Sequence, residues 1–338
     1  LRFDDITPYV ADANEISEWF NEAGYGDSSI VSDTIGVAEK CSAEVETGRS
    51  LLPKYMKSLD SDEYLEEIAL FALTEKGLDE DPDYFTRLME ELSIIGELNF
   101  SDYFLIIWDL IKWADTNGIG RGTGRGSVGG SLLAYVLDIT VVDPLKHDLL
   151  FARFINPERN DYPDIDLDFE DKRRKEVKDY LVERWGYDNV AAISTYGEFK
   201  AKSVIKDVSR VFALPYADVN GITPLFETLG ELKTNEKGRL FCNRYPDIIK
   251  TAEKLEGRIR NTGIHAAGMV VSSVPLSEVC PMETRKEVGG SDRSLVSAFE
   301  MNDAEKIGLI KIDILGLKTV SVISDCIKKI KELHGVDV

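Results

Sequence analysis

The heptapeptide Pro-Asp-Ile-Asp-Leu-Asp-Phe at residues 163–169 decides how the rest of the sequence is interpreted. Side chains alternate between the two faces of an extended strand, so Asp164, Asp166 and Asp168 would share one face while the apolar residues enter a core. Carboxylates this close repel one another unless a cation lies among them. Hard oxygen ligands without nearby histidine or cysteine favour Mg²⁺, so the pattern indicates a metal site. A solvated acidic edge strand explains the heptapeptide equally well.

A second acidic segment lies near the C-terminus, at residues 308–316 (Gly-Leu-Ile-Lys-Ile-Asp-Ile-Leu-Gly). Period-2 alternation places Lys311 and Asp313 on one face of this predicted strand and isoleucines on the other. An acid and a base within so apolar a strand are costly to bury, so they should reach a cleft or pair with another group. A surface pair between Lys311 and Asp313 is the simpler alternative. Together, the two remote strands predict a two-metal cradle.

Charge is distributed unevenly along the 338 residues, a length sufficient for two or three domains. The net charge of −21 argues against a nucleic-acid partner. Residues 1–100, however, hold 24 acidic and 7 basic side chains, whereas the remainder holds 37 acidic and 33 basic ones. The acidity therefore belongs to the N-terminal part, which would not lie on a phosphate backbone.

The sequence also predicts the compartment and the state of the chain. No apolar run is long enough to span a membrane and no signal peptide is recognisable, so we expect a cytoplasmic protein without a membrane partner. Four well-separated cysteines predict neither a zinc site nor a disulfide framework, but packing as small apolar residues. They are Cys41, Cys242, Cys280 and Cys326. Because the sequence begins with Leu1 rather than methionine, we expect a fragment of a longer chain or a processed one.

A glycine-rich loop occupies residues 118–131 and opens a predicted helix. Such a loop presents backbone N–H groups and the positive end of a helix dipole to an anion. Four side chains add positive charge and hydroxyl donors: Arg121, Arg125, Ser127 and Ser131. Residues 124–129 fit the dinucleotide fingerprint only weakly because no strand precedes them, and the P-loop pattern fails. The loop thus favours triphosphate binding over a plain flexible linker.

Periodicity places further helices and strands along the chain. Helices are predicted at 14–23, 32–41, 61–73, 84–95, 103–114, 172–185, 202–211 and 246–255, and other strands at 190–195 and 268–272. The aromatic residues of the 103–114 helix are interpreted as core rather than as a base-stacking platform. His265 is interpreted as a hydrogen-bonded structural residue rather than a catalytic base.

A basic stripe follows one face of the 202–211 helix. It consists of Lys202, Lys206 and Arg210, opposite Val204, Val208 and Val211. Cations four residues apart on one helical face suit a nucleic-acid backbone. A solvated charged face is the usual alternative for such a run.

Several long motifs, in order and in register, resemble the C-family replicative DNA polymerases, the family of the alpha subunit of bacterial DNA polymerase III. These motifs are residues 124–127, 143–145, 149–159, 163–169, 262–268 and 311–317. The resemblance implies an α+β chain, with a polymerase beta-like nucleotidyltransferase palm and an inserted helical thumb. It divides the chain into a remnant of the polymerase and histidinol phosphatase domain (1–40), palm (41–195), thumb (196–272), palm (273–320) and the start of the fingers (321–338).

The resemblance also implies roles for individual residues. Asp164, Asp166 and Asp313 would be the catalytic carboxylates that bind two Mg²⁺ ions, and Asp168 would not be one of the three. Nucleotide and phosphate contacts are implied for Arg125, Gly126, Ser127, Arg153, Arg159 and Lys311. The stripe Lys202, Lys206 and Arg210 would grip duplex DNA. The metal-ligating histidines of the preceding domain are absent, so no proofreading by that domain is expected.

The implied reaction is template-directed DNA synthesis from a deoxynucleoside triphosphate onto a primer 3′ hydroxyl. Primer–template DNA, the nucleotide and the remaining polymerase domains or replisome subunits would be the partners. The sequence stops soon after Leu317, where the fingers would begin. Two alternatives stay open. One is a noncatalytic palm and thumb module that needs fingers from another chain. The other is a template-independent nucleotidyltransferase.

Overall fold

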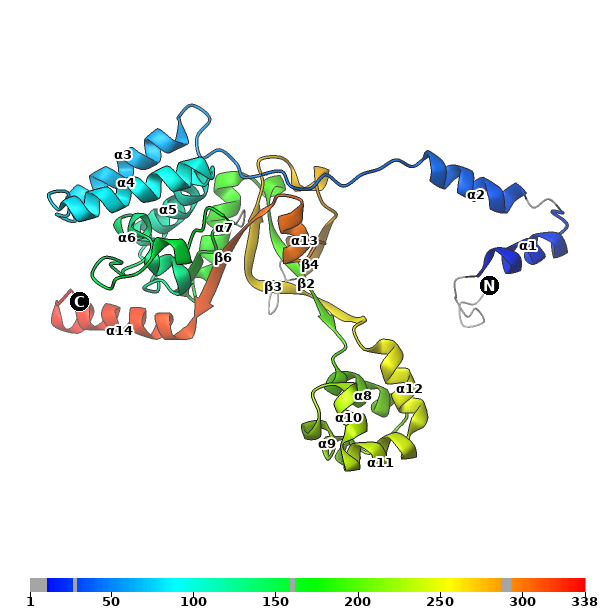
Figure 1. Cartoon of the computed structure of the whole chain (residues 1–338). Helices are drawn as coiled ribbons and strands as arrows, with labels where there is room; N and C mark the ends of the chain where they lie inside the picture. The colour runs from blue at the N-terminus through cyan, green and yellow to red at the C-terminus, as the bar shows by residue number, and fades with distance from the viewer. Residues whose placement is uncertain (1–10, 27–28, 159–161, 287–292, 338) are drawn as a thin grey trace. The chain divides into compact units, whose positions relative to one another are not determined.

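The structure is a computed structural model of the chain (Figure 1). It describes residues 11–26, 29–158, 162–286 and 293–337. The chain divides into two compact units, residues 1–46 and 47–338. The first unit contains α1 (Ala13–Glu22) and α2 (Ser29–Lys40), close to the two helices predicted there. The α1 helix begins with a capping box, in which Asp12 accepts hydrogen bonds from backbone N–H groups of the first turn.

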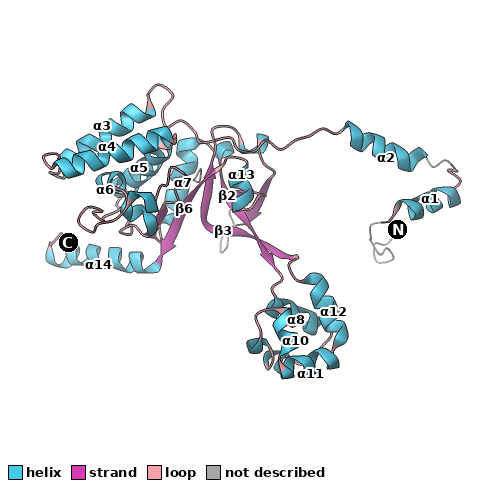
Figure 2. Cartoon of the chain, in the orientation of Figure 1, coloured by secondary structure: helices cyan, strands magenta, loops and turns pink. Residues whose placement is uncertain are grey.

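A six-stranded mixed sheet lies in the second unit (Figure 2). Its order is β1-β6-β3-β2-β5-β4, with β1 parallel to β6, β2 parallel to β5 and the other neighbours antiparallel. The strands are β1 (Asp166–Glu170), β2 (Val190–Glu198), β3 (Ile259–Val271), β4 (Met282–Lys286), β5 (Arg293–Ser297) and β6 (Ile310–Leu317). The combination of this sheet with many helices confirms the predicted α+β class.

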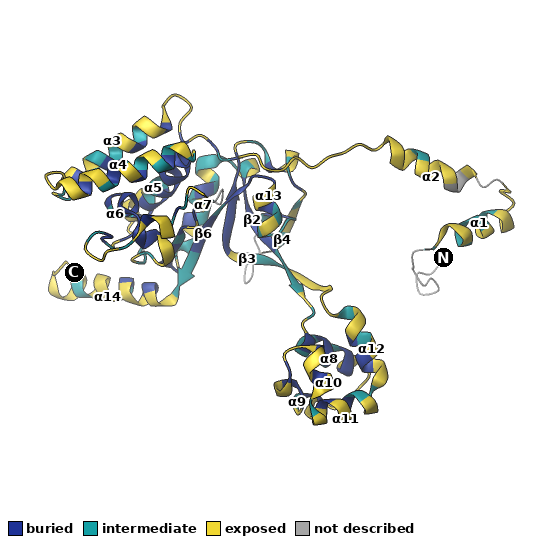
Figure 3. Ribbon diagram, in the orientation of Figure 1, coloured by how far each residue is buried: buried dark blue, intermediate teal, exposed yellow. Residues whose placement is uncertain are grey.

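The two faces of the sheet bury separate apolar cores. On one face, Leu167 and Phe169 of β1 join a large core shared with α3, α4, α5, α6 and α7. The other face packs against α13. The helices of both layers are α3 (Ser61–Glu75), α4 (Pro82–Glu97), α5 (Ser101–Thr116), α6 (Leu132–Val136), α7 (Arg174–Trp185) and α13 (Met301–Lys306). Because its aromatics Tyr103 and Phe104 are buried, α5 is a core helix, as predicted (Figure 3).

A group of five helices between β2 and β3 has its own core. They are α8 (Ala201–Val211), α9 (Tyr216–Asn220), α10 (Leu229–Thr234), α11 (Glu236–Arg244) and α12 (Pro246–Leu255). Val204 and Val208 of α8 point into this core, but Val211 is 82% exposed, contrary to the predicted apolar face. Val211 lies about 20° from Val204 around the helix axis, so it is on the same face. It is the last residue of α8 and lies beyond the residues of this helix that pack into the core.

Two further sequence-based expectations can be compared with the structure. All four cysteines are free, and only Cys280 is buried. Cys41 and Cys326 are exposed, so the expectation that they pack as small apolar residues was wrong. Cys41 directly follows α2, and Cys326 lies on α14. Within the described part of the chain, no helix combines the length and the apolar character needed to cross a membrane.

Candidate metal centre beside a glycine-rich loop

Strands β1 and β6 bring three aspartates from remote parts of the sequence together. The strands run parallel, and their register places Asp313 directly beside Asp166. Asp164 lies two residues before Asp166, ahead of the first residue of β1. One carboxylate oxygen from each of the three lies within 4.8 Å of the others. The acidic groups expected to share a site therefore meet, and their metal-binding and catalytic roles stay predictions.

The three carboxylates differ in burial. The side chain of Asp164 is 62% exposed, whereas that of Asp313 is only 9% exposed. Asp313 Oδ1 is buried and has no hydrogen-bond partner among the residues that the structure describes. Buried polar atoms are normally paired, so this oxygen is directed at a position where a cation or a donor is expected.

Gly268 of β3 leaves room for the Asp313 carboxylate. It pairs directly with Asp313 in the antiparallel ladder between β3 and β6. A Cβ atom at Gly268 would lie 2.8 Å from His265 Nδ1 and 3.4 Å from Asp313 Oδ1. His265 Nδ1 accepts a hydrogen bond from the Gly268 N–H at 2.7 Å, in agreement with the structural role expected for this histidine.

Lys311 neutralises part of the acidic cluster. Its ammonium lies 2.8 Å from Asp313 Oδ2 and 3.3 Å from Asp164 Oδ1, and its side chain is 9% exposed. Burial by itself lowers the pKa of Lys311, but the hydrogen bond and charge of Asp313, together with Asp164, raise that pKa above its ordinary value. The ammonium therefore stays protonated at neutral pH. It faces the aspartates in this structure, and its predicted phosphate contact stays a prediction.

Arg125 of the glycine-rich loop lies against the same cluster. Its Nη1 is 3.1 Å from Asp166 Oδ2, and its Nε is 3.2 Å from Asp168 Oδ2. Burial raises the pKa of Asp166, the charge of Arg125 lowers it, and the charges of Asp164 and Asp313 raise it further, so the pKa ends above its ordinary value. A carboxyl group whose pKa rises on folding opposes folding above that pKa, and a bound cation would relieve this cost.

The residues present fit a divalent cation with a preference for oxygen ligands. The cluster contains three carboxylates and no histidine or cysteine, which suits Mg²⁺ better than zinc. The unpaired Asp313 Oδ1 and the raised pKa of Asp166 are both expected where a cation completes the charge balance. Mg²⁺ typically binds through one or two carboxylates and keeps places for water and substrate phosphate.

The first part of the glycine-rich loop runs antiparallel beside β1. The N–H of Gly122 donates to the Asp168 carbonyl at 2.8 Å, and the N–H of Glu170 donates to the Gly120 carbonyl at 2.8 Å. A Cβ atom at Gly122 would lie 2.8 Å from the Asp168 Cβ, so this close approach requires glycine. The loop thereby covers the edge of the sheet and is fixed beside the strand that carries Asp166.

The tip of the loop is exposed and depends on glycine conformation. Gly124 and Gly126 have φ values of +86° and +76°, which other residues rarely adopt. A 3₁₀ turn, η2 (Gly126–Gly130), follows. Arg125, Gly126 and Ser127 are all exposed. Successive N–H groups in such a turn form a concave surface that suits an anion such as a phosphate group.

The helix after the loop, α6, already has an anion at its N-terminus. The carboxylate of Glu91, from α4, accepts hydrogen bonds from the N–H groups of Leu132 and Leu133 at 2.9 and 3.0 Å. The hydroxyl of Ser131 donates to Glu91 at 2.8 Å. Ser131 is thus occupied internally, so the expectation that it adds a free hydroxyl to a phosphate site was wrong. A phosphate group would have to meet the η2 turn instead of α6.

Glu91 is a residue that sequence reasoning missed. It is 0% exposed, and burial raises its pKa although its hydrogen bonds oppose the shift. Arg87, one turn earlier, pairs with it at 2.7 Å and donates to the Gly130 carbonyl at 2.8 Å. The available signal was an acidic residue within the apolar stripe of α4, between Leu88 and Ile95.

Replacing Glu91 with glutamine is expected to lower the free energy of unfolding by about 2 kcal/mol, since hydrogen bonds to a buried charged group are lost. Glutamine keeps the volume but offers one acceptor oxygen where the carboxylate has two. Chemical denaturation of the chain measures the change. Glu90→Gln, at an exposed position of the same helix, is the matched control and should leave the stability unchanged. Equal stabilities of the two variants would contradict the role assigned to Glu91.

The sequence predicts three further arginines near a bound phosphate group. Arg121 is tied internally, because its Nε lies 2.7 Å from Asp115 and its Nη1 donates to the Asp138 carbonyl at 2.6 Å. Arg153 ends a short 3₁₀ turn and is exposed. Arg159 lies outside the described residues. The structure therefore removes Arg121 from the candidate set.

The basic stripe on α8 is partly neutralised. Lys202 forms an ion pair with Glu227, and Arg210 lies 2.7 Å from Asp207. Lys206 forms no ion pair with any residue of the described ranges and is half-buried. Of the three cations expected to bind DNA, Lys206 is thus the one without an ion pair among the described residues. The DNA-binding role of all three stays a prediction.

Comparison with known proteins identifies the family. The model of the bacterial DNA polymerase III alpha NTPase domain matches residues 62–316, a range that includes the three aspartates and the glycine-rich loop. The chain belongs to this family, as its motifs predicted.

Individual relatives agree with this membership. The chain is 42% identical to DNA polymerase III subunit alpha of Aquifex aeolicus, over 90% of this chain and 30% of that protein. It is 37% identical to the subunit of the same name from Xylella fastidiosa (97% and 29%) and to that from Bacillus subtilis (90% and 28%). The chain therefore spans about 30% of the length of these relatives.

Proposed function

We propose that this chain is the catalytic part of a DNA-directed DNA polymerase that extends a primer 3′ hydroxyl with deoxynucleoside triphosphates during replication. The observation that carries the proposal is the meeting of Asp164, Asp166 and Asp313 within 4.8 Å, beside an exposed glycine-rich loop. Membership of the DNA polymerase III alpha family supports the same reaction. Primer–template DNA and the nucleotide are the proposed ligands, and further polymerase domains or replisome subunits are the proposed partners.

The sheet would serve as the palm, with the polymerase beta-like nucleotidyltransferase fold. The five helices α8–α12 would serve as the thumb, a narrower range than the predicted 196–272, because residues 259–271 form β3 of the sheet. In this reading, the thumb is inserted between the adjacent antiparallel strands β2 and β3. The start of the fingers would follow β6. This arrangement keeps the metal-binding strands β1 and β6 rigid, because both are paired within the sheet.

The chain's own residues would act by position and charge. Asp164, Asp166 and Asp313 would hold two Mg²⁺ ions, which lower the pKa of the primer hydroxyl and neutralise charge on the leaving group. The backbone of Gly126 and the hydroxyl of Ser127 would contact the triphosphate. Arg125, Arg153, Arg159 and Lys311 would supply positive charge around it.

Primer extension by the full-length polypeptide tests the proposal. Template-dependent incorporation that stops when EDTA removes the divalent cation supports it. Incorporation that continues without template would instead identify a template-independent nucleotidyltransferase. The absence of any incorporation, with intact fold and with Mg²⁺ present, would contradict catalysis and favour a noncatalytic module.

Replacing Lys206 with alanine is expected to weaken binding to duplex DNA and to reduce the slope of log affinity against log salt by about one. The reason is the loss of one phosphate contact at the only position of the stripe that forms no ion pair among the described residues. Fluorescence anisotropy with a labelled primer–template, at several salt concentrations, measures the slope. Lys250→Ala, at an exposed position of α12, is the control for loss of charge. An unchanged slope for Lys206→Ala would remove α8 from the proposed DNA interface.

A further inference from the structure

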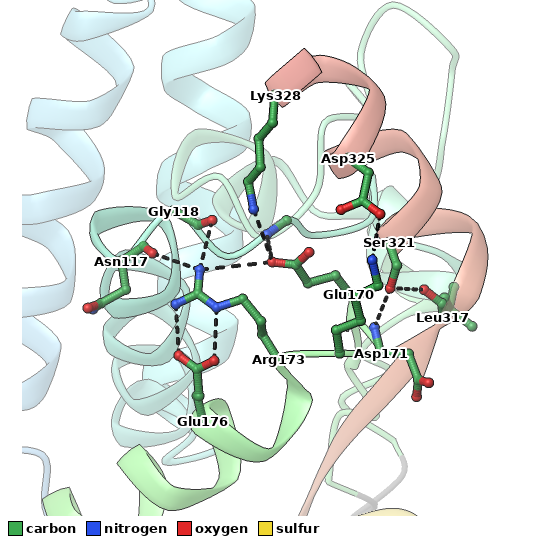
Figure 4. Close-up of polar contacts among 12 residues, drawn as sticks. Asn117, Gly118, Glu170, Asp171, Arg173, Glu176, Leu317, Ser321, Asp325 and Lys328 are labelled. Carbon is green, nitrogen blue, oxygen red and sulfur yellow. Dashed lines mark hydrogen bonds and ion pairs between the residues drawn. The ribbon is translucent and has the colours of Figure 1, made fainter. Parts of the chain in front are cut away.

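Three segments of the chain meet at the C-terminal end of β1 (Figure 4). They are the entry to the glycine-rich loop (residues 117–120), the first turn of α7, and α14 (Lys318–His334). At their centre lies Glu170, the last residue of β1, which is 1% exposed. The proposed reaction does not use this buried carboxylate, although it stands on the same strand as Asp166.

Glu170 is hydrogen-bonded to both polar backbone groups of Gly120. Its N–H donates to the Gly120 carbonyl at 2.8 Å, and its Oε1 accepts from the Gly120 N–H at 3.3 Å. The same Oε1 lies 4.0 Å from Arg173 Nη1 and 3.9 Å from Lys328 Nζ. Lys328 comes from α14, so one buried carboxylate contacts the loop entry and two cations from different helices. Burying this charge is tolerated because it is paired and hydrogen-bonded.

Arg173 fixes the loop entry from the other side. Its guanidinium donates to the carbonyls of Asn117 and Gly118 at 3.0 and 3.1 Å, and it forms two hydrogen bonds with Glu176. These two residues directly follow α5, so the cation lies at the C-terminal end of the helix and interacts favourably with its dipole. The residues that lead into the loop are therefore bound to the start of α7 as well as to β1.

Helix α14 is attached to the same end of β1. The N–H of Asp171 donates to Ser321 Oγ at 2.9 Å, and Lys172 Nζ lies 2.5 Å from Asp325 Oδ2. Three successive residues, from Glu170 to Lys172, thus contact one face of α14. Because consecutive backbone and side-chain groups are all involved, α14 cannot shift along β1 without breaking several of these contacts.

Helix α14 also approaches the loop directly. A Cβ atom at Gly120 would lie 1.8 Å from Ser324 Oγ and 3.0 Å from Ser324 Cβ. Gly120 is not among the glycines with positive φ, so its backbone accepts alanine. Rotation of the Ser324 side chain would relieve the contact with Oγ but not the 3.0 Å contact with Cβ, so the tight approach at this position comes from α14.

We propose that this junction couples α14 to the glycine-rich loop, with Glu170 and Gly120 as positioning residues. The path is short, because Gly120 is bound to Glu170, Gly122 is bound to Asp168, and the exposed tip with Arg125 follows within three residues. A displacement of α14 would move Gly120 and thereby change where the tip lies relative to the aspartates. The effect on nucleotide binding rests on the proposed function, whereas the coupling itself does not.

The test introduces a steric clash between positions 120 and 324 and then relieves it with a second substitution. Gly120→Ala should displace Ser324 and accelerate hydrogen exchange of the amides of residues 120–126 by at least about tenfold, a loss of local opening free energy. It should also weaken binding of a deoxynucleoside triphosphate with Mg²⁺ by about fivefold, the lower end of typical couplings between sites. The double variant Gly120→Ala with Ser324→Gly should restore both, and Ser324→Gly alone is the control.

Each outcome has a defined meaning. Unchanged exchange in Gly120→Ala, or failure of the double variant to restore it, overturns the coupling. Faster exchange with unchanged nucleotide affinity overturns the positioning role. If the unaltered chain binds no nucleotide, the proposed function fails, and the exchange result still decides the coupling. Should Gly120→Ala not fold, Glu170→Gln replaces it, because glutamine keeps the acceptor for Gly120 but loses the charge that pairs with Lys328; unchanged exchange there also overturns the coupling.

Discussion

Replacing Asp313 with asparagine is expected to slow primer extension by at least about 10²–10³-fold while the chain stays folded. Asp313 is the one carboxylate of the cluster that comes from β6, and its buried Oδ1 has no partner among the described residues. An amide of the same size keeps the volume but cannot supply the charge that a cation needs. Single-turnover primer extension measures the rate, and circular dichroism verifies the fold.

The control for Asp313→Asn is Asp303→Asn, which also removes one carboxylate. Asp303 lies on α13 and forms an exposed pair with Lys306, so extension should not change. Asp164→Asn should slow extension as Asp313→Asn does but disturb the fold less, because Asp164 is 62% exposed. Normal extension by folded Asp313→Asn would refute the assignment of this residue to the metal site. Loss of extension together with loss of fold would instead assign Asp313 to the core.

The strands that carry the aspartates could be recognised from local patterns. Alternation at residues 163–169 and 308–316 indicates strands with acidic and apolar faces. Strand β6 confirms the second, and β1 confirms the first from Asp166 onward, whereas Asp164 lies ahead of the strand. The parallel pairing of Asp166 with Asp313 is not a local property, because no pattern within either strand specifies a partner so remote in the sequence. The resemblance to the polymerase family predicts that Asp166 and Asp313 lie in one site, and the structure places them side by side.

Other features depend on tertiary contacts. Strands β4 and β5 consist largely of charged and polar residues, so neither shows an apolar alternation, and both form because the sheet supplies partners. The role of Glu91 depends on the N–H groups of Leu132 and Leu133, whose approach is set by how α4 and α6 pack. The junction at Glu170 likewise arises from three segments that only the tertiary fold brings together.

Replacing Lys311 with methionine is expected to lower the free energy of unfolding at neutral pH by about 3–5 kcal/mol, the usual cost of breaking a buried ion pair. Methionine keeps most of the apolar stem, but the ammonium 2.8 Å from Asp313 is lost. Chemical denaturation measures the change. Lys306→Met, which breaks the exposed pair with Asp303, is the control and should leave stability unchanged. A stability equal to that of the unaltered chain would mean that Lys311 does not compensate the aspartates.

The pH dependence of this loss can be derived from the two pKa shifts. The pKa of Lys311 is raised in the folded chain, so its contribution to stability is complete below its ordinary pKa and is lost only as the pH rises through the raised value. The pKa of Asp166 is also raised, so its ionised form opposes folding, and removing the charge of Lys311 would raise this pKa further. Lowering the pH through the raised pKa of Asp166 protonates the folded variant more than its unfolded state and stabilises it.

The difference in free energy of unfolding between Lys311→Met and the unaltered chain should therefore be largest near neutral pH. It should become smaller toward about pH 4, the ordinary range of carboxyl groups. Added Mg²⁺ should also reduce this difference in free energy at neutral pH, because a cation bound only by the folded state replaces the lost charge. A difference that stays constant with pH and with Mg²⁺ would show that Lys311 stabilises the sheet by packing, without compensating the charge of the three aspartates.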